Sequence, residues 1–195
     1  MKTKEETLKD GTVVRIRNLT AHDLDRLMDF YLDLPPEDRR YLKFDVTDRE
    51  AVRERFRLMR AGRLLRIVAL VDDEIVGDGV LEFSTERWRR DQAEMRVLVA
   101  RPFQHKGLGS VLMRELYLLA VARGVHKIVG KMARPQQAAI AICHKLGFRE
   151  EVVIPDYVQD VAGEPQDLVV LIADIKDLWH ELEWLYKDQD MGRYQ

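Results

Sequence analysis

The chain has 195 residues, 46% hydrophobic and 34% charged, with a formal net charge of −2 at pH 7. This length suits one domain with decorations, and the small negative charge argues against nucleic acid as the main partner. The single cysteine, Cys143, excludes an intrachain disulfide, and the histidines lack ligand spacing, so we expect no metal. No apolar run is long enough for a membrane span or a signal peptide, and we expect a cytoplasmic protein without a membrane partner.

The first part of the chain predicts a tail, a strand and two helices. Residues 1–11 are rich in Lys and Glu and are expected to form a flexible tail. Residues 12–18 alternate apolar and polar side chains, as in a half-buried strand. Thr20 offers an N-cap for a helix that ends at a Pro-Pro pair, and residues 47–50 form a capping box for a second helix, which Gly62 ends.

The rest of the chain alternates strands and helices. Strands are predicted over residues 64–71, 75–84, 92–99, 127–132, 152–158 and 168–173, with helices before Arg123 and after Pro135. We therefore expect an α/β (α+β) domain over residues 12–174, with a mixed central sheet of about six to seven strands and flanking helices. Residues 175–195 predict an extra C-terminal amphipathic helix and tail.

The most informative stretch runs from Ala93 to Leu116, where a strand leads through a glycine-punctuated turn into an amphipathic helix. The turn has the sequence Gln-His-Lys-Gly-Leu-Gly over residues 104–109. Its glycines allow the backbone to approach a phosphate closely, and the helix that follows adds the partial positive charge of its N-terminus. The stretch therefore predicts an anion-binding site for a phosphorylated cofactor.

This pattern resembles the Q/R-x-x-G-x-G/A signature of the GNAT superfamily of N-acetyltransferases. A second signature of that family, a helix ending in K-L-G-F, is matched by residues 145–148. The resemblance implies a GNAT fold and an N-acetyltransferase that uses acetyl-CoA (coenzyme A) as co-substrate.

The resemblance also assigns cofactor-binding positions. In the family the pantetheine arm pairs with the main chain of the strand before the turn, here at Leu98 and Val99. Gln136 falls where the family commonly has an Asn that contacts the cofactor, although an exposed glutamine at a helix start is an equally simple explanation. The diphosphate is expected to lie against Gln104, His105, Lys106, Gly107, Leu108, Gly109 and Ser110.

Acetyl transfer to an amine needs a base, because a free lysine amine has a pKa of about 10.4. Glu94 aligns with the strand position that supplies this base in several family members, and Glu82 on the preceding strand is the alternative. The family usually has a Tyr acid where this chain has Cys143. The thiol is a candidate proton donor for the leaving thiolate, or simply a small buried packing residue.

The acceptor is expected to be a primary amine. Residues 14–17 and 30–39 faintly resemble the start of bacterial protein-lysine acetyltransferase catalytic domains, which favours a protein lysine slightly over a small-molecule amine. The alternatives are a catalytically weak GNAT-fold sensor or regulator that binds acyl-CoA, and a binding module for another phosphate ligand. The sequence is compatible with a monomer or a homodimer, and it specifies neither the acceptor nor the acyl chain.

Overall fold

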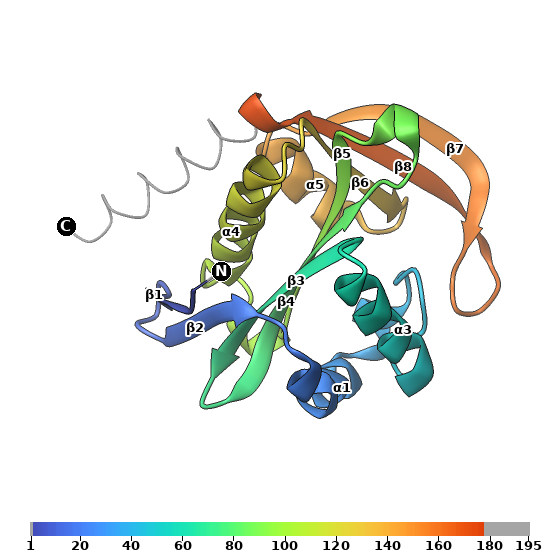
Figure 1. Cartoon of the computed structure of the whole chain (residues 1–195). Helices are drawn as coiled ribbons and strands as arrows, with labels where there is room; N and C mark the ends of the chain where they lie inside the picture. Colours follow the sequence, from blue (N-terminus) through green and yellow to red (C-terminus); the bar gives the residue numbers. More distant parts are fainter. Residues whose placement is uncertain (1, 178–195) are drawn as a thin grey trace.

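The computed structural model describes residues 2–177 and shows an eight-stranded sheet with the order β1-β2-β3-β4-β5-β6-β8-β7 (Figure 1). All neighbouring strands are antiparallel except β5 and β6, which run parallel. The mixed sheet agrees with the sequence prediction. The strands are β1 (Lys4–Thr7), β2 (Val13–Asn18), β3 (Leu64–Val71), β4 (Glu74–Phe83), β5 (Gln92–Val99), β6 (Lys127–Ala133), β7 (Arg149–Gln159) and β8 (Pro165–Asp174).

Helices cover both faces of the sheet. On one face, α1 and α3 pack through buried residues such as Leu27 and Val52, and on the other α4 and α5 pack through Leu112 and Ile140 (Figure 1). Because β3 is covered on both faces, its apolar residues form a nearly continuous run. The helices are α1 (Leu24–Asp33), α2 (Pro36–Arg39), α3 (Arg49–Arg60), α4 (Leu108–Ala122) and α5 (Gln137–Lys145), with 3₁₀ turns η1 (Ala21–Asp23), η2 (Arg87–Arg89) and η3 (Arg101–Phe103).

The prediction of a flexible tail over residues 1–11 is wrong, because this segment contains β1, which pairs with β2 at the edge of the sheet. Lys4 Nζ lies 2.6 Å from Glu115 Oε2 on α4, and Leu8 is 4% exposed. The Lys- and Glu-rich composition is that of a charged edge strand, which discourages pairing with other chains. The helix and tail predicted over residues 175–195 lie, apart from the first three residues, outside the described part of the chain.

Two glycines of β4 bring α4 close to the sheet. A Cβ added at Gly77 would lie 2.9 Å from Leu112 Cδ1 and 3.3 Å from Leu108 Cδ2. At Gly79 it would lie 3.1 Å from Leu116 Cδ1. Without side chains at these positions, α4 packs directly on the β4 backbone, and its first residue is fixed beside the end of β5.

A charged network is buried between β3, β4 and α1. Arg66 and Asp78 are both fully buried, with Arg66 Nε 2.8 Å from Asp78 Oδ1. Tyr31 from α1 accepts a hydrogen bond from Arg66 and donates one of 3.1 Å to Asp78. Burial, together with the charge of Asp78, raises the pKa of Tyr31. The pairing offsets the cost of removing two charges from water and joins α1 to the sheet.

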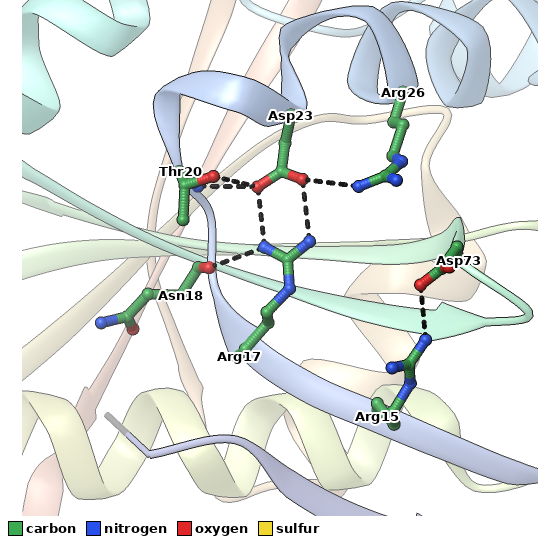
Figure 2. A network of polar contacts seen from close by, with 7 residues as sticks. All are labelled: Arg15, Arg17, Asn18, Thr20, Asp23, Arg26 and Asp73. Carbon is green, nitrogen blue, oxygen red and sulfur yellow. Dashed lines mark hydrogen bonds and ion pairs between the residues drawn. The ribbon is translucent and has the colours of Figure 1, made fainter.

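A second network fixes the connection from β2 to α1 (Figure 2). Arg17 donates two parallel hydrogen bonds of 2.7 and 2.8 Å to the carboxylate of Asp23, which is 1% exposed. The N–H and hydroxyl of Thr20 also donate to this carboxylate, at 2.8 and 2.7 Å. The hydrogen bond from Arg17 is the main cause that lowers the pKa of Asp23. Thr20, predicted as the N-cap of the helix, is the N-cap of the 3₁₀ turn η1 that leads into α1, whose own N-cap is Asp23.

We predict that Asp23→Asn lowers the free energy of unfolding by about 2–3 kcal/mol near neutral pH, because charge-assisted hydrogen bonds are lost from a buried carboxylate. Since the folded-state pKa is lowered, the wild-type advantage is present above the unfolded pKa of about 3.9 and disappears as the pH falls through the folded-state value. Urea denaturation of both proteins between pH 3 and 7 measures the difference. An equal difference at every pH would contradict this account.

Candidate active site

Strands β5 and β6 separate after a short parallel pairing. Their register covers only Gln92–Glu94 of β5 against Lys127–Val129 of β6, whereas β5 stays paired with β4 as far as Val99. The last five residues of β5 therefore have a partner strand on one side only. Glu94 is the last paired residue and lies at the point of divergence.

The direction of the main chain along β5 follows from two hydrogen bonds toward β4. The N–H of Ser84 donates to the carbonyl of Gln92, and the N–H of Ala100 donates to the carbonyl of Val76. The main-chain N–H and C=O groups of successive residues point to opposite sides of a strand. Those of the even-numbered residues of β5 therefore point to β4, and those of the odd-numbered residues point into the gap between β5 and β6. Val99 therefore faces the gap as expected, but Leu98 does not, and Val97 takes its place. The side chain of Leu98 packs against the core under α1 and α3.

The glycine turn lies at the end of β5, as predicted. His105 and Gly107 have positive φ angles of 61° and 92°, and Gly107 is the N-cap of α4. The N–H groups of the first helical residues, Leu108, Gly109 and Ser110, have no acceptor within the helix and suit an anion. A Cβ added at Gly109 would meet nothing within 4 Å, so open space adjoins these groups. This turn fits a diphosphate.

The side chains of the turn have partners of their own. Gln104 Nε2 donates to the carbonyl of Val99 at 3.0 Å and ties the turn back to β5. Lys106 Nζ lies 2.7 Å from Asp10 Oδ2, and the N–H of Lys9 donates to the carbonyl of Lys106 at 3.1 Å. The hydrogen bond from Lys106 lowers the pKa of Asp10 to about 2. Lys106 therefore already pairs with a carboxylate, and a diphosphate would have to share or displace that contact.

A cavity of about 510 Å³ lies beside the point where β5 and β6 separate. It is formed by the segment before α3, α3 itself, the ends of β4 and β5, and β6. Six basic and four acidic side chains line it, so its charge differs in sign from that of the whole chain. These are Lys43, Arg55, Arg63, Arg89, Arg96 and Lys131, with Glu54, Glu82, Glu86 and Glu94.

The structure brings the two candidate bases together in this cavity. Glu82 and Glu94 are directly opposite each other on β4 and β5, which places both carboxylates on one face of the sheet. Glu94 is bound by two lysines, Lys43 and Lys131, the second at 2.5 Å, and Glu82 is bound by Arg55. These cations offset the repulsion between the two carboxylates.

The charged side chains of the cavity and their partial burial change the pKa values of Lys43 and Glu82. Burial, and then the charge of Lys131, lowers the pKa of Lys43 from 10.5 to about 8. Burial tends to raise the pKa of Glu82, but the hydrogen bond and charge of Arg55, together with Lys43, lower it below its usual value. Arg55 therefore holds Glu82 in its ionised form. What distinguishes Glu94 is its position, at the last residue where β5 pairs with β6.

The other two candidates lie outside the cavity lining. Cys143 packs against the core under α4 and α5, and burial raises the pKa of its thiol to about 11. It stays protonated at neutral pH, which excludes a resting thiolate nucleophile. The Oε1 atom of Gln136 accepts a hydrogen bond of 2.9 Å from the N–H of Ala133, so this side chain closes the turn before α5.

The cations around Glu94 were not predicted from the sequence. Lys131 follows Val129 by two residues on β6, and Val129 pairs with Glu94, so strand alternation alone would have placed it near the carboxylate. Lys43 lies in a connection without regular structure and carries no such signal. Its neighbour Phe44 contacts two guanidinium groups, those of Arg55 at 5.4 Å and Arg96 at 5.5 Å from the ring centroid.

The described residues were also searched for a metal-binding group and for a membrane-spanning helix. Within residues 2–177, no group of three or more His, Cys, Asp or Glu side chains is arranged to hold a metal ion. In this described part of the chain, no helix has both the length and the apolar character needed to cross a membrane.

One family model and several solved structures match this chain. The family model described as the acetyltransferase (GNAT) family matches residues 24–148. A search of curated proteins finds no match. Among solved structures, the chain is similar to the GNAT domain of PAT from S. lividans, with 20% identity, a TM-score of 0.71, and coverage of 88% of this chain and 96% of that one.

Two further structures are informative. The yncA structure from Salmonella typhimurium, which contains its cofactor acetyl-CoA, has 20% identity and a TM-score of 0.70, with coverage of 83% of this chain and 94% of that one. The ribosomal-protein-alanine N-acetyltransferase from Brucella melitensis has 26% identity and a TM-score of 0.64. Here the coverage is 82% of this chain and 98% of that one.

We predict that Gly109→Val abolishes binding of acetyl-CoA while leaving the fold intact. The added side chain meets no protein atom at its Cβ and fills the space beside the N–H groups of the turn. Thermal unfolding with and without acetyl-CoA measures both effects. We expect the ligand-induced rise in Tm of the wild type to vanish in the variant, whose Tm without ligand changes by only about 1–2 °C. A variant that is stabilised by acetyl-CoA like the wild type would contradict the assignment.

Proposed function

The chain belongs to the GNAT acetyltransferase family, and from this premise we propose that it transfers the acetyl group of acetyl-CoA to the side-chain amine of a protein lysine. Dependence on acetyl-CoA and transfer to nitrogen follow from the family, whereas the lysine acceptor is the proposed part. The observation that carries the proposal is the position of Glu94, which lies at the divergence of β5 and β6 and also lines the cavity.

The cofactor is proposed to bind along a path that starts at the glycine turn. Main-chain N–H groups of α4 bind the diphosphate. The gap-facing groups of Val97 and the N–H of Val99 pair with the pantetheine arm, because the carbonyl of Val99 already accepts a hydrogen bond from Gln104. This direction brings the thioester, which supplies the activated acetyl group, to the point of divergence beside Glu94. The acceptor amine then enters from the cavity on the opposite side.

Glu94 is proposed to act as the base. An ordinary lysine acceptor is protonated at neutral pH and has to lose a proton before its nitrogen can attack the thioester. The two ammonium groups on Glu94 hold its carboxylate at the mouth of the gap, where an incoming amine replaces one of them. Glu82 lies on the same face, tied to Arg55, and serves to orient the acceptor rather than to remove its proton.

The leaving thiolate of coenzyme A takes up a proton, and Cys143 is the candidate donor. Cys143 keeps its proton at neutral pH, as a donor must, with a pKa of about 11. Its position among core residues equally supports a packing role. We retain Cys143 as the proposed acid because coenzyme A is already a fair leaving group and needs only a weak donor.

We predict that Glu94→Gln lowers kcat by about 10²–10⁴-fold with little change in KM for acetyl-CoA, because a general base contributes about this much. Glu82→Gln is the matched control on the opposite strand, with an expected effect of less than about tenfold. Steady-state kinetics with an acceptor found by screening proteins and small amines measures both. A wild type that binds acetyl-CoA but acetylates no acceptor would favour the acyl-CoA sensor, and an unchanged kcat in Glu94→Gln would remove Glu94 as the base.

A protein acceptor is supported by the surface next to the cavity. The η2 turn carries Trp88, which is 82% exposed, between Arg87 and Arg89, and Arg89 also lines the cavity. An exposed tryptophan between cations provides a contact surface for a polypeptide beyond the amine itself. One of the similar structures, named as a ribosomal-protein-alanine N-acetyltransferase, adds general support for a protein acceptor.

We predict that Trp88→Ala raises KM about tenfold for a protein acceptor but leaves kcat/KM for a small amine unchanged, since only the larger acceptor reaches η2. Leu118→Ala, on the exposed side of α4, is a control for loss of an exposed apolar side chain. Parallel kinetics with both kinds of acceptor measures the effect. An equal loss for both acceptors would show that Trp88 acts on the cavity itself and would weaken the protein-acceptor proposal.

A further inference from the structure

The amine of Lys43 occupies the position that the proposed function requires of an acceptor. Its Nζ contacts the Oε2 atom of Glu94, the proposed base, inside the cavity beside the divergence of β5 and β6. The side chain enters from the segment between α2 and α3, on the cavity side of the sheet. A lysine of the chain itself thus has the arrangement of a bound substrate.

The backbone around Lys43 is anchored on both sides. Leu42 and Phe44 pack against the core under α1 and α3, and Val46 is 2% exposed within that core. Phe44 also contacts the guanidinium groups of Arg55 and Arg96. These contacts hold Lys43 at the mouth of the cavity, so its place beside Glu94 does not depend on one surface ion pair.

We propose that Lys43 is an acetylation site of the protein's own active centre and becomes acetylated when acetyl-CoA binds in the absence of an external acceptor. The inference rests on the proposed function, because it uses the same cofactor path and the same base. It adds a modification site within the chain and a way for the acetyl donor to change the cavity.

The reaction balances without a further reactant. The ammonium of Lys43 first loses a proton to solvent, and the neutral nitrogen attacks the carbonyl carbon of the thioester. A C–N bond forms and the C–S bond breaks. One of the two protons left on the nitrogen passes by way of Glu94 to the departing thiolate, and the other stays on the amide. Burial lowers the pKa of Lys43 to about 8, so a larger share of this side chain is neutral near pH 7 than of an ordinary lysine.

Lys131 provides an internal comparison. Its Nζ also contacts Glu94, at 2.5 Å, but it projects from β6, one of the two diverging strands. Both lysines line the cavity, but Lys43 reaches Glu94 from the segment between α2 and α3 and not from the sheet itself. Acetylation of Lys43 would convert an ammonium into an amide, remove its ion pair with Glu94, and leave Lys131 as the remaining ammonium on that carboxylate.

The test is incubation of the purified full-length protein with acetyl-CoA, followed by intact mass and peptide mapping. We expect one acetyl group at Lys43, and at least about a tenfold slower gain in Lys43→Arg, whose guanidinium cannot be acetylated in this way. Lys127→Arg, an exposed position on β6, is the matched control and should be acetylated at Lys43 like the wild type. Acetylation mapped to Lys131, or spread over surface lysines, would overturn the proposal.

Two further measurements separate enzymatic from chemical acetylation. The rate at Lys43 should rise with pH and level off above about 8, whereas chemical acetylation of ordinary lysines should keep rising toward about 10.4. Gly109→Val should abolish it, and an unchanged rate in that variant would overturn the proposal. A wild type that acetylates an external amine but never Lys43 would refute this inference alone, whereas failure to bind acetyl-CoA would refute it together with the proposed function.

Discussion

Strands β5 and β6 run parallel and separate after three residues, and the candidate site depends on this separation. A parallel pair needs a crossover connection, here α4, and the same crossover places the helix N-terminus at the end of β5. One strand therefore carries the carboxylate at its divergence point, main-chain groups that face a gap, and the turn that suits an anion. Unpaired main-chain N–H and C=O groups along a strand need hydrogen-bond partners. A gap inside the sheet is therefore suited to a ligand that pairs with the strand and extends the sheet.

Buried charged side chains under α1 and α3 support the candidate site from below the cavity. Arg66 and Arg96 lie on either side of Val80 on the same face of the sheet, and only Arg66 has a carboxylate partner in the buried network. The Nε and Nη2 atoms of Arg96 are buried and meet no hydrogen-bond acceptor within residues 2–177. Arg96 instead stacks on Phe44, which explains how a segment without regular structure is held over the cavity.

Much of the fold was predictable because it depends on local patterns. Alternation predicted β2, with Val14 and Ile16 fully buried, and the glycine turn was predicted because glycine and a helix start are both local signals. The site was predicted only in part. Whether Leu98 or Val97 faces the gap depends on the register with β4, which no single segment contains. The place of Lys43 depends on packing between a connection and two helices, and β1 was missed because its charges resemble those of a tail.

The contact between the N-terminal hairpin and the glycine turn has a thermodynamic consequence. Asp10 and the main chain of Lys9 bind Lys106, in the loop whose helix receives the anion. A ligand that draws Lys106 away from Asp10 therefore weakens the attachment of β1. By linkage, loss of the Lys106–Asp10 contact changes the affinity for such a ligand by the same free energy by which the ligand weakens that contact. The edge strand and the cofactor turn are thus energetically coupled. A chain that lacks the residues before Asp10 would bind the ligand with a different affinity from the intact chain.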